Sequence, residues 1–193
     1  MKRRIALVST NNVYSAPYLP LTVGSIWAYA KAKGSAADFA EPVWLYRKEP
    51  IDKAVARLGW PLPELAAFSD YIWNHEWNLA LARVIKQLSP STIILFGGIH
   101  VPDDPPETFF DDHPEIDFLI HGEGELAFAR FLEEHAGNRD WSKVPGLSMR
   151  GLKTERKFAS VEEMPSPYLD GTFDSIINES PNWQVLQETN RGC

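Results

Sequence analysis

Short runs of strand-forming residues alternate along this chain with longer runs of helical period, and no other feature limits its possible folds as strongly. Apolar residues recur at helical spacing after Pro20, after Asn74 and over Glu123–His135, and Pro105–Asp112 reads as a short helix. The alternation predicts an α/β fold in which a doubly wound, five-stranded parallel sheet is flanked by helices. The segments predicted as its strands, several of them continuous apolar runs of the kind buried on both faces, are Ile5–Ser9, Val43–Arg47, Leu65–Ile72, Thr92–Phe96 and Ile116–Ile120.

The regular pattern stops near Gly137, which suggests three parts. Residues 1–137 are predicted to form the α/β domain. Residues 138–181 would hold a short strand within Pro145–Arg150 and a linker extension rich in proline and acidic residues. Residues 182–193 would begin a further unit, because Trp183–Glu188 alternates apolar and polar residues as a strand does.

Charge and cysteine content exclude several classes of protein. The chain has 193 residues and a formal net charge of −7, which argues against nucleic-acid or anionic-lipid partners because both need clustered Lys and Arg. No apolar run is long enough to cross a bilayer, so no membrane association is expected. The one cysteine permits no internal disulfide, and this indicates a cytoplasmic protein.

Sheets of this Rossmann or flavodoxin type bind ligands beyond the carboxyl ends of their strands, near the point where strand order reverses. Four loops should therefore converge, and they hold most of the unusual residues: Thr10–Leu19, Ser69–Asn74, Gly97–Pro106 and His121–Glu125.

The loop after the fourth predicted strand reads FGGIHVPDDP. Gly97 and Gly98 either form a tight turn or let the backbone approach a ligand without a Cβ in the way. His100 is open to three interpretations, as a loop hydrogen-bonding group, a metal ligand or an acid–base group. Asp103 and Asp104 suggest Mg²⁺ binding, but the carboxylates that such a site needs after the first strand are missing.

The turn HGEGE, residues 121–125, has glycines at Gly122 and Gly124 that permit close approach, and acids that suit a helix N-terminus. No Lys-Ser/Thr pair follows these glycines, which excludes a P-loop, and residues 9–24 hold one glycine, which excludes a dinucleotide fingerprint. No Ser-His-Asp or Cys-His arrangement is evident. Strand ends that are rich in glycine and aromatic residues favour binding of a large cofactor over unaided catalysis.

Four motifs together resemble the N-terminal cobalamin-binding domain of B12-dependent radical S-adenosylmethionine (SAM) enzymes. They are YLPLTVGSIWAYAKAKG, FSDYIWN, FGGIHVPDDPPE and IDFLIHGEGE, and the resemblance covers residues 5–135. It implies that the corrin ring of cobalamin lies over the strand ends and that the nucleotide tail enters beside the sheet. The Asp-x-His-x-x-Gly motif, which supplies a histidine to cobalt in methionine-synthase-like domains, is absent after the first strand, and Val13 stands near the place of that histidine. Many radical SAM relatives also lack the motif, so no axial histidine is expected from this loop.

The resemblance implies specific cobalamin-binding positions. Ser69 takes the place of the serine that meets the nucleotide tail, and the glycine pair makes room for that tail. The full set of predicted cobalamin-binding residues is Asn12, Tyr14, Pro17, Ser69, Tyr71, Trp73, Asn74, Gly97, Gly98, His100, Gly122, Glu123 and Gly124.

The sequence ends in ETNRGC, which resembles the approach to the Cys-x-x-x-Cys-x-x-Cys loop of a radical SAM barrel. Cys193 would be the first ligand of a [4Fe–4S] cluster, which needs three thiolates at that spacing. We therefore expect a front part of a longer enzyme, whose partner is its own C-terminal radical SAM domain and whose further cofactors are the cluster and S-adenosylmethionine. Methyl transfer is the expected reaction of the whole enzyme, with no catalysis by these residues alone.

Two other classes remain open at this point. One is a degenerate α/β binding or interaction module that has lost cobalamin, for which the missing axial histidine argues. The other is a flavodoxin-like or receiver-like domain, against which the missing acid after the first strand argues in the receiver case.

Overall fold

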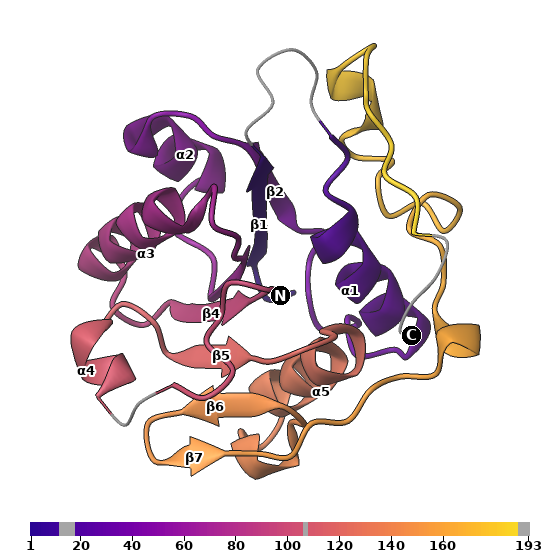
Figure 1. Cartoon of the computed structure of the whole chain (residues 1–193). Coiled ribbons are helices and arrows are strands. Elements are labelled where there is room, and N and C mark those ends of the chain that lie inside the picture. Colours follow the sequence, from indigo (N-terminus) through magenta and orange to yellow (C-terminus); the bar gives the residue numbers. More distant parts are fainter. Residues whose placement is uncertain (12–17, 106–107, 189–193) are drawn as a thin grey trace.

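The computed structural model describes residues 1–11, 18–105 and 108–188. Within them lies one seven-stranded sheet in the order β2-β1-β3-β4-β5-β6-β7 (Figure 1). Five strands are parallel and are joined by helical crossovers, whereas β6 and β7 pair antiparallel at one edge. The strands are β1 (Ile5–Asn11), β2 (Val43–Arg47), β3 (Leu65–Ser69), β4 (Ile93–Gly97), β5 (Phe118–Ile120), β6 (Leu147–Met149) and β7 (Leu152–Lys153).

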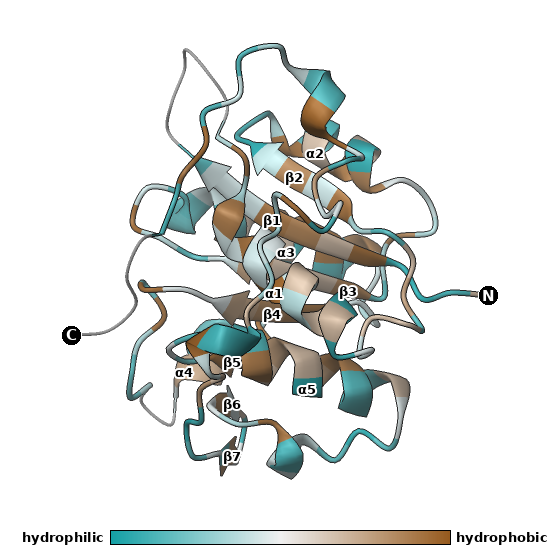
Figure 2. Cartoon of the chain, turned by 90° about the vertical axis from the view of Figure 1, so that its right-hand side faces the viewer, coloured by the Kyte–Doolittle hydropathy of each residue, from teal (hydrophilic) through white to brown (hydrophobic). Residues whose placement is uncertain are grey.

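Helices cover both faces of the parallel sheet. On one face, α1 (Leu21–Ala32) packs beside α5 (Glu125–Ala136), and on the other α2 (Ile51–Leu58) packs beside α3 (His75–Leu88) (Figure 1). Successive strand residues point to opposite faces, so Leu65 and Ala67 join the α1–α5 core while Ala66 joins the α2–α3 core. Brown, hydrophobic strands accordingly run through the centre of Figure 2.

The ends of α1 and α3 follow from local sequence. Helix α1 starts directly after Pro20, and Gly34 beyond its last turn adopts φ +79°, the left-handed conformation that commonly follows a helix and that glycine adopts without a steric cost. Asn74 stands at the N-cap of α3, as expected, but its side chain does not cap the helix. The Asn74 side-chain amide instead bonds to the segment before the helix: it accepts a hydrogen bond from the Tyr71 backbone amide and donates one to the Ser69 carbonyl oxygen.

The chain beyond β7 runs back across the α1 face. Phe173 and Ile176 are buried there, and Tyr46 Oη donates to Glu179 Oε2 at 2.5 Å. The backbone amide of Leu19 donates to the carbonyl oxygen of Gln184 at 3.0 Å. This C-terminal segment is therefore packed against the α/β unit through residues that lie far from α1 in sequence.

Several sequence expectations need correction. The sheet has seven strands instead of five, because the short strand expected within Pro145–Arg150 forms as β6 and joins the sheet, and the unexpected two-residue strand β7 pairs with it. Trp183–Glu188 forms no strand; Gln184 makes an isolated bridge to Tyr18, since no neighbouring strand continues the pairing. The helix expected over Pro105–Asp112 is reduced, in the described residues, to α4 (Phe109–Asp112).

Candidate functional site

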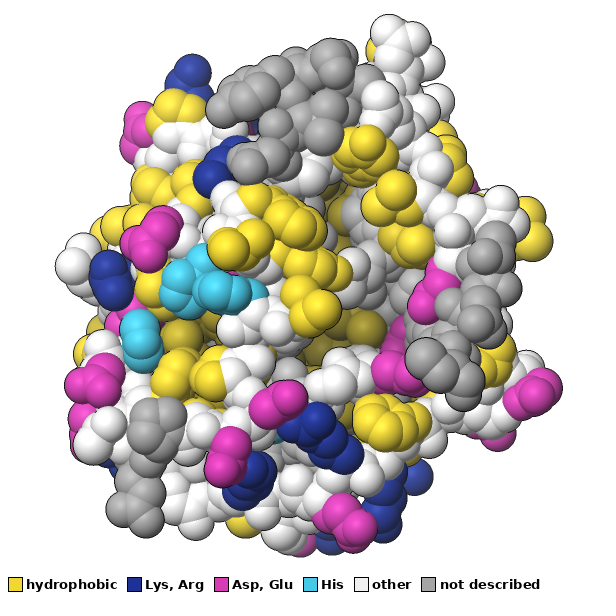
Figure 3. Space-filling model, in the orientation of Figure 1, with side chains coloured by type: hydrophobic (Ala, Val, Ile, Leu, Met, Phe, Trp, Pro, Cys, Tyr) yellow, Lys and Arg dark blue, Asp and Glu magenta, His cyan; other side chains and the backbone are white. Residues whose placement is uncertain are grey.

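A cavity of about 860 Å³ opens at the carboxyl ends of β3, β4 and β5. The order β2-β1-β3 places the reversal of strand order between β1 and β3, and doubly wound sheets bind their ligands at this point. Figure 3 shows the hollow from this side, with hydrophobic side chains around it and histidines on the same face. Of the four loops expected to converge, those after β3, β4 and β5 do so, whereas the loop after β1 lies mostly outside the described residues.

The inner walls of the cavity are apolar and come from two layers. Helix α1 contributes Val23 and Ile26, the strands contribute Ala67 and Leu95, and α5 contributes Phe128. Polar groups are concentrated where the strands end. Such a surface suits a ligand with a large apolar part and a few fixed polar atoms.

Register aligns the three strand ends that form the base of the site. Ser69 pairs with Gly97, and Gly97 pairs with Ile120. At Gly97 an added Cβ would meet no described atom nearer than 3.7 Å. At Gly98, where φ is +115°, it would lie 2.6 Å from the Asp70 carbonyl oxygen. The two glycines thus differ: Gly98 is required by the turn, while Gly97 leaves space in the cavity.

Two buried polar atoms in the cavity wall have no hydrogen-bond partner in the described part of the chain. They are Ser69 Oγ and His121 Nδ1, and the residues that carry them are 4% and 3% exposed. The other ring nitrogen of His121 lies 2.8 Å from Ser148 Oγ. Burial, aided by Arg156 and Lys153, lowers the pKa of His121 and keeps its imidazole neutral. An unpaired buried polar group costs about 1–3 kcal/mol, so both atoms favour a polar ligand.

The β5–α5 turn forms the next part of the rim, with Gly122, Glu123 and Gly124 all lining the cavity. Gly122 has φ +75°, and its Cβ would lie 2.9 Å from the ring of Phe158. That ring, half exposed and contributed by the segment after β7, also lines the cavity.

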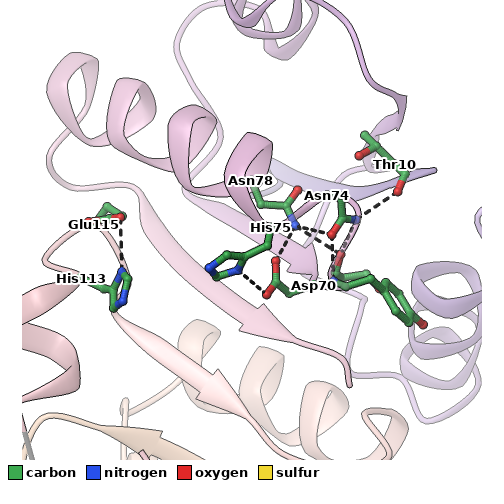
Figure 4. A network of polar contacts seen from close by, with 9 residues as sticks. Thr10, Asp70, Asn74, His75, Asn78, His113 and Glu115 are labelled. Atoms are coloured by element: carbon green, nitrogen blue, oxygen red, sulfur yellow. Dashed lines mark hydrogen bonds and ion pairs between the residues drawn. The ribbon is translucent and has the colours of Figure 1, made fainter. Parts of the chain in front are cut away.

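Of the cobalamin-binding residues predicted in the loop after β3, one lines the cavity and two support the loop. Tyr71 lines the cavity and stacks on Trp73 at a centroid distance of 4.5 Å, but Trp73 and Asn74 are not among the lining residues. The Asn74 amide donates to the carbonyl oxygens of Thr10 and Ser69, both at 3.0 Å (Figure 4). Asn74 therefore ties the ends of β1 and β3 together beneath the site.

His100 lines the cavity rim and is exposed, and its ring meets the ring of His75 edge-on at 4.6 Å. Four predicted residues, Asn12, Tyr14, Pro17 and Cys193, lie outside the described residues. Sequence reasoning did not select His121 or Phe158. The position of His121 directly after a buried strand was an available signal, whereas nothing near Phe158 points to the cavity.

No helix in the described ranges is long and apolar enough to span a membrane.

Comparisons with known proteins agree on one family. The family model described as "B12 binding domain" matches residues 37–132. The chain is 37% identical to the 2-(S-pantetheinyl)-carbapenam-3-carboxylate methyltransferase of Streptantibioticus cattleyicolor, over 99% of this chain and 29% of that protein. It is 35% identical to the cobalamin-dependent radical SAM methyltransferase TokK of Streptomyces tokunonensis, with the same coverage.

Among solved structures, the cobalamin-dependent S-adenosylmethionine radical enzyme OxsB with aqua-cobalamin bound superimposes with a TM-score of 0.73. The match covers 99% of this chain and 27% of that one at 19% identity, so it concerns the fold. The chain spans about 29% of the length of the two curated methyltransferases.

Proposed function

Because this chain belongs to the B12-binding domain family and is homologous to cobalamin-dependent radical SAM methyltransferases, we propose that it binds cobalamin in the cavity at the ends of β3, β4 and β5. The observation that carries this proposal is the pair of unpaired polar atoms, Ser69 Oγ and His121 Nδ1, buried in an otherwise apolar wall. A ligand with both apolar and hydrogen-bonding parts satisfies them.

The size of the cavity indicates which part of cobalamin enters. About 860 Å³ is too small to enclose a whole corrinoid but accommodates its nucleotide tail. The tail would lie between Ser69 and α1, passing Gly97 and Gly98, and the corrin ring would rest on the rim. The rim residues proposed to meet the ring are Tyr71, His100, Gly122, Glu123 and Gly124, all of which line the opening.

The remaining predicted residues have supporting roles in this proposal. Trp73 and Asn74 hold the β3–α3 loop, through the ring stack with Tyr71 and the bonds to Thr10 and Ser69. Asn12, Tyr14 and Pro17 would complete the rim from the loop after β1. The relatives' greater length supports a longer enzyme in which residues 1–137 bind cobalamin, 138–181 link, and 182–193 lead into a radical SAM barrel with Cys193 as its first cluster ligand.

Cobalamin, when bound, carries a methyl group in methyl-transfer chemistry; a [4Fe–4S] cluster and S-adenosylmethionine in the barrel would supply the radical. The residues of this chain bind and orient the cofactor and exclude water from its tail. His121 is held neutral by burial, so its ring can donate one hydrogen bond and accept another without placing a charge in the apolar wall.

Titration with hydroxocobalamin, followed by its visible spectrum, tests the proposal. We expect saturable binding by the wild-type chain and about three- to tenfold weaker binding by Ser69→Ala, as for loss of one hydrogen bond. Folding should be unharmed, because the hydroxyl has no partner among the described residues. The matched control is Ser35→Ala, at the other end of α1, where the hydroxyl donates to Glu133 at 2.7 Å; it should change stability and leave binding intact.

Absence of binding at high micromolar hydroxocobalamin, with the chain folded, would reject the proposal. It would favour the degenerate binding module instead.

A further inference from the structure

Three metal-binding side chains from three different segments meet beside the cavity. Asp70 follows β3, His75 opens α3, and His100 lies in the loop after β4. One ligand atom from each lies within 4.8 Å of the other two. Among the residues that the structure describes, no other group of three or more His, Cys, Asp or Glu side chains converges in this way. Asp70 and His75 do not line the cofactor cavity, whereas His100 stands on its rim.

Backbone hydrogen bonds hold the segments that carry these side chains. The Asp70 amide donates to the Gly97 carbonyl oxygen at 2.6 Å, and the His100 amide donates to the Asp70 carbonyl oxygen at 3.2 Å. The His75 amide donates to the Tyr71 carbonyl oxygen at 3.0 Å. The positive φ of Gly98 permits the close contact with Asp70. The main chain therefore fixes Asp70 and His100 next to each other independently of their side chains.

The Asp70 carboxylate is buried and held in one orientation. Its residue is 1% exposed, and Oδ1 accepts a hydrogen bond from Asn78 Nδ2 at 2.8 Å (Figure 4). Its Oδ2 lies 2.8 Å from His75 Nδ1. A hydrogen bond to the second oxygen of a ligating carboxylate is the usual outer support of a metal site. Asn78 supplies this support and leaves Oδ2 directed toward the histidines.

We propose that Asp70, His75 and His100 bind one divalent transition-metal ion of the Zn²⁺ class. Two imidazoles and one carboxylate are a ligand set that Zn²⁺, Co²⁺ and Fe²⁺ accept. Bonds of about 2.0–2.2 Å in a tetrahedron place ligand atoms roughly 3.3–3.6 Å apart. On metal binding, the exposed His100 side chain would move its ring nitrogen to this distance from the other two ligand atoms. The distance between Asp70 Oδ2 and His75 Nδ1, now 2.8 Å, would increase slightly. Because His100 is exposed and His75 is partly exposed, the fourth position faces solvent.

A nearby histidine–carboxylate pair provides a matched comparison. His113 Nδ1 lies 3.8 Å from Glu115 Oε1, and both residues are drawn in Figure 4. Arg83 already occupies that carboxylate at 3.0 Å, and no second histidine joins the group in the described residues. The side chains of His113 and His75 are equally exposed, at 28% each. His113→Gln thus removes a similar imidazole without touching the proposed site.

The test uses the tag-free, chelator-treated chain without cobalamin, carrying Cys193→Ser so that the single thiol of the sequence cannot bind metal. Calorimetry with Zn²⁺ and absorption spectroscopy with Co²⁺ should show one ion bound per chain. His75→Gln and His100→Gln should each weaken affinity by at least about tenfold, whereas His113→Gln should leave it unchanged. Mg²⁺ should not compete, since it prefers oxygen ligands.

Far-ultraviolet circular dichroism confirms folding of each variant, and His100→Gln is the safest of them because the side chain is exposed. Failure to bind Zn²⁺ at submillimolar concentration would overturn the proposal and leave a hydrogen-bonded Asp70–His75 pair only. So would unchanged affinity in the folded His100→Gln variant. A separate hydroxocobalamin titration of the same samples measures cofactor binding, so that failure of the metal site and failure of the cofactor proposal can be told apart.

Discussion

Gly97 offers the sharpest residue-scale test of the cavity, because its effects on folding and binding should have opposite signs. Its φ lies outside the left-handed region, and an added Cβ would meet Ile120 at ordinary contact distances of 3.7 and 3.9 Å. Gly97→Ala should raise the free energy of unfolding by up to about 0.4–1 kcal/mol, since it restricts the unfolded chain. The same methyl group occupies space in the cavity, so hydroxocobalamin affinity should fall. Chemical denaturation and spectral titration measure the two effects.

Gly98→Ala provides the contrast. Its Cβ would lie 2.6 Å from the Asp70 carbonyl oxygen, with φ at +115°. The free energy of unfolding of this variant should therefore fall, whereas that of Gly97→Ala should rise. If folded Gly97→Ala binds hydroxocobalamin as tightly as the wild type, the ligand does not pass Gly97.

Residues that end a strand were predictable from sequence, but the direction of their side chains was not. Ser69 and Gly97 follow apolar runs, and parallel strands end at one edge of the sheet, which is enough to bring them together. Asn74 stands where a helix cap was expected, yet its amide reaches the carbonyl oxygens of Thr10 and Ser69. Whether the Asn74 side chain caps α3 or bonds to these carbonyl oxygens depends on where β1 ends in space. No local sequence pattern carries that information.

At the scale of elements, the apolar strands of the parallel sheet were recognised from sequence, and so was a short strand within Pro145–Arg150, which forms as β6. The core strands bury every second residue against each helix layer, so their composition is constrained throughout. The two-residue strand β7 carries too little periodicity to be recognised, and no local pattern shows that β6 pairs antiparallel with β5. Trp183–Glu188 alternates like a strand, but only Gln184 finds a pairing partner. A strand needs a free edge beside it, which sequence alone does not reveal.

The packing of α1 against the C-terminal segment leads to a prediction at this scale. A Cβ on Gly24, at the end of the first turn of α1, would lie 2.3 Å from Cζ of the buried Phe173 ring. Gly24→Ala gains helix propensity of about 0.5–1 kcal/mol but overpacks a filled site, which costs about 1–3 kcal/mol. We expect a net loss of about 1 kcal/mol, relieved when Phe173→Leu makes room.

A double-mutant cycle by chemical denaturation measures this relief as a coupling free energy. Coupling of about 1 kcal/mol is expected, as for other side chains in contact. Additivity within about 0.3–0.5 kcal/mol would show that the C-terminal segment does not press on Gly24.

At the scale of the whole molecule, the cavity is assembled from segments that are distant in sequence. Doubly wound topology accounts for the strand ends, and α1 follows as the helix that crosses over from β1 to β2. Phe158 reaches the rim only because the chain returns after the β6–β7 hairpin, where Arg156 pairs with Asp103 at 2.6 Å. The course of the chain back to the cavity depends on the antiparallel β6–β7 extension of the sheet. The position of Phe158 on the rim could therefore not be predicted from sequence, although the walls formed by the strands and α1 could.

Acid sensitivity of the whole fold should depend on His135, which is buried at the end of α5. Its ring stacks on Phe39 at 5.8 Å, and neither ring nitrogen has a hydrogen-bond partner in the described part of the chain. Burial, with smaller effects of Arg3 and Arg139, lowers the pKa of His135 from 6.5 to about 4. Above pH 6.5 the residue is neutral in both states and has no effect. Below pH 6.5 the unfolded chain takes up a proton that the folded chain excludes.

The free energy of unfolding should therefore fall as the pH drops from 6.5, by about 1.4 kcal/mol per pH unit from this residue. The accumulated loss reaches about 3 kcal/mol near pH 4. His121, whose pKa is also lowered by burial, adds to the fall in the same direction. His135→Phe should reduce the slope measured by denaturation between pH 7 and pH 5. An unchanged slope in His135→Phe would mean that the buried imidazole is protonated in the folded protein, with Glu64, 4.0 Å from its Nε2, as the partner that stabilises the charge.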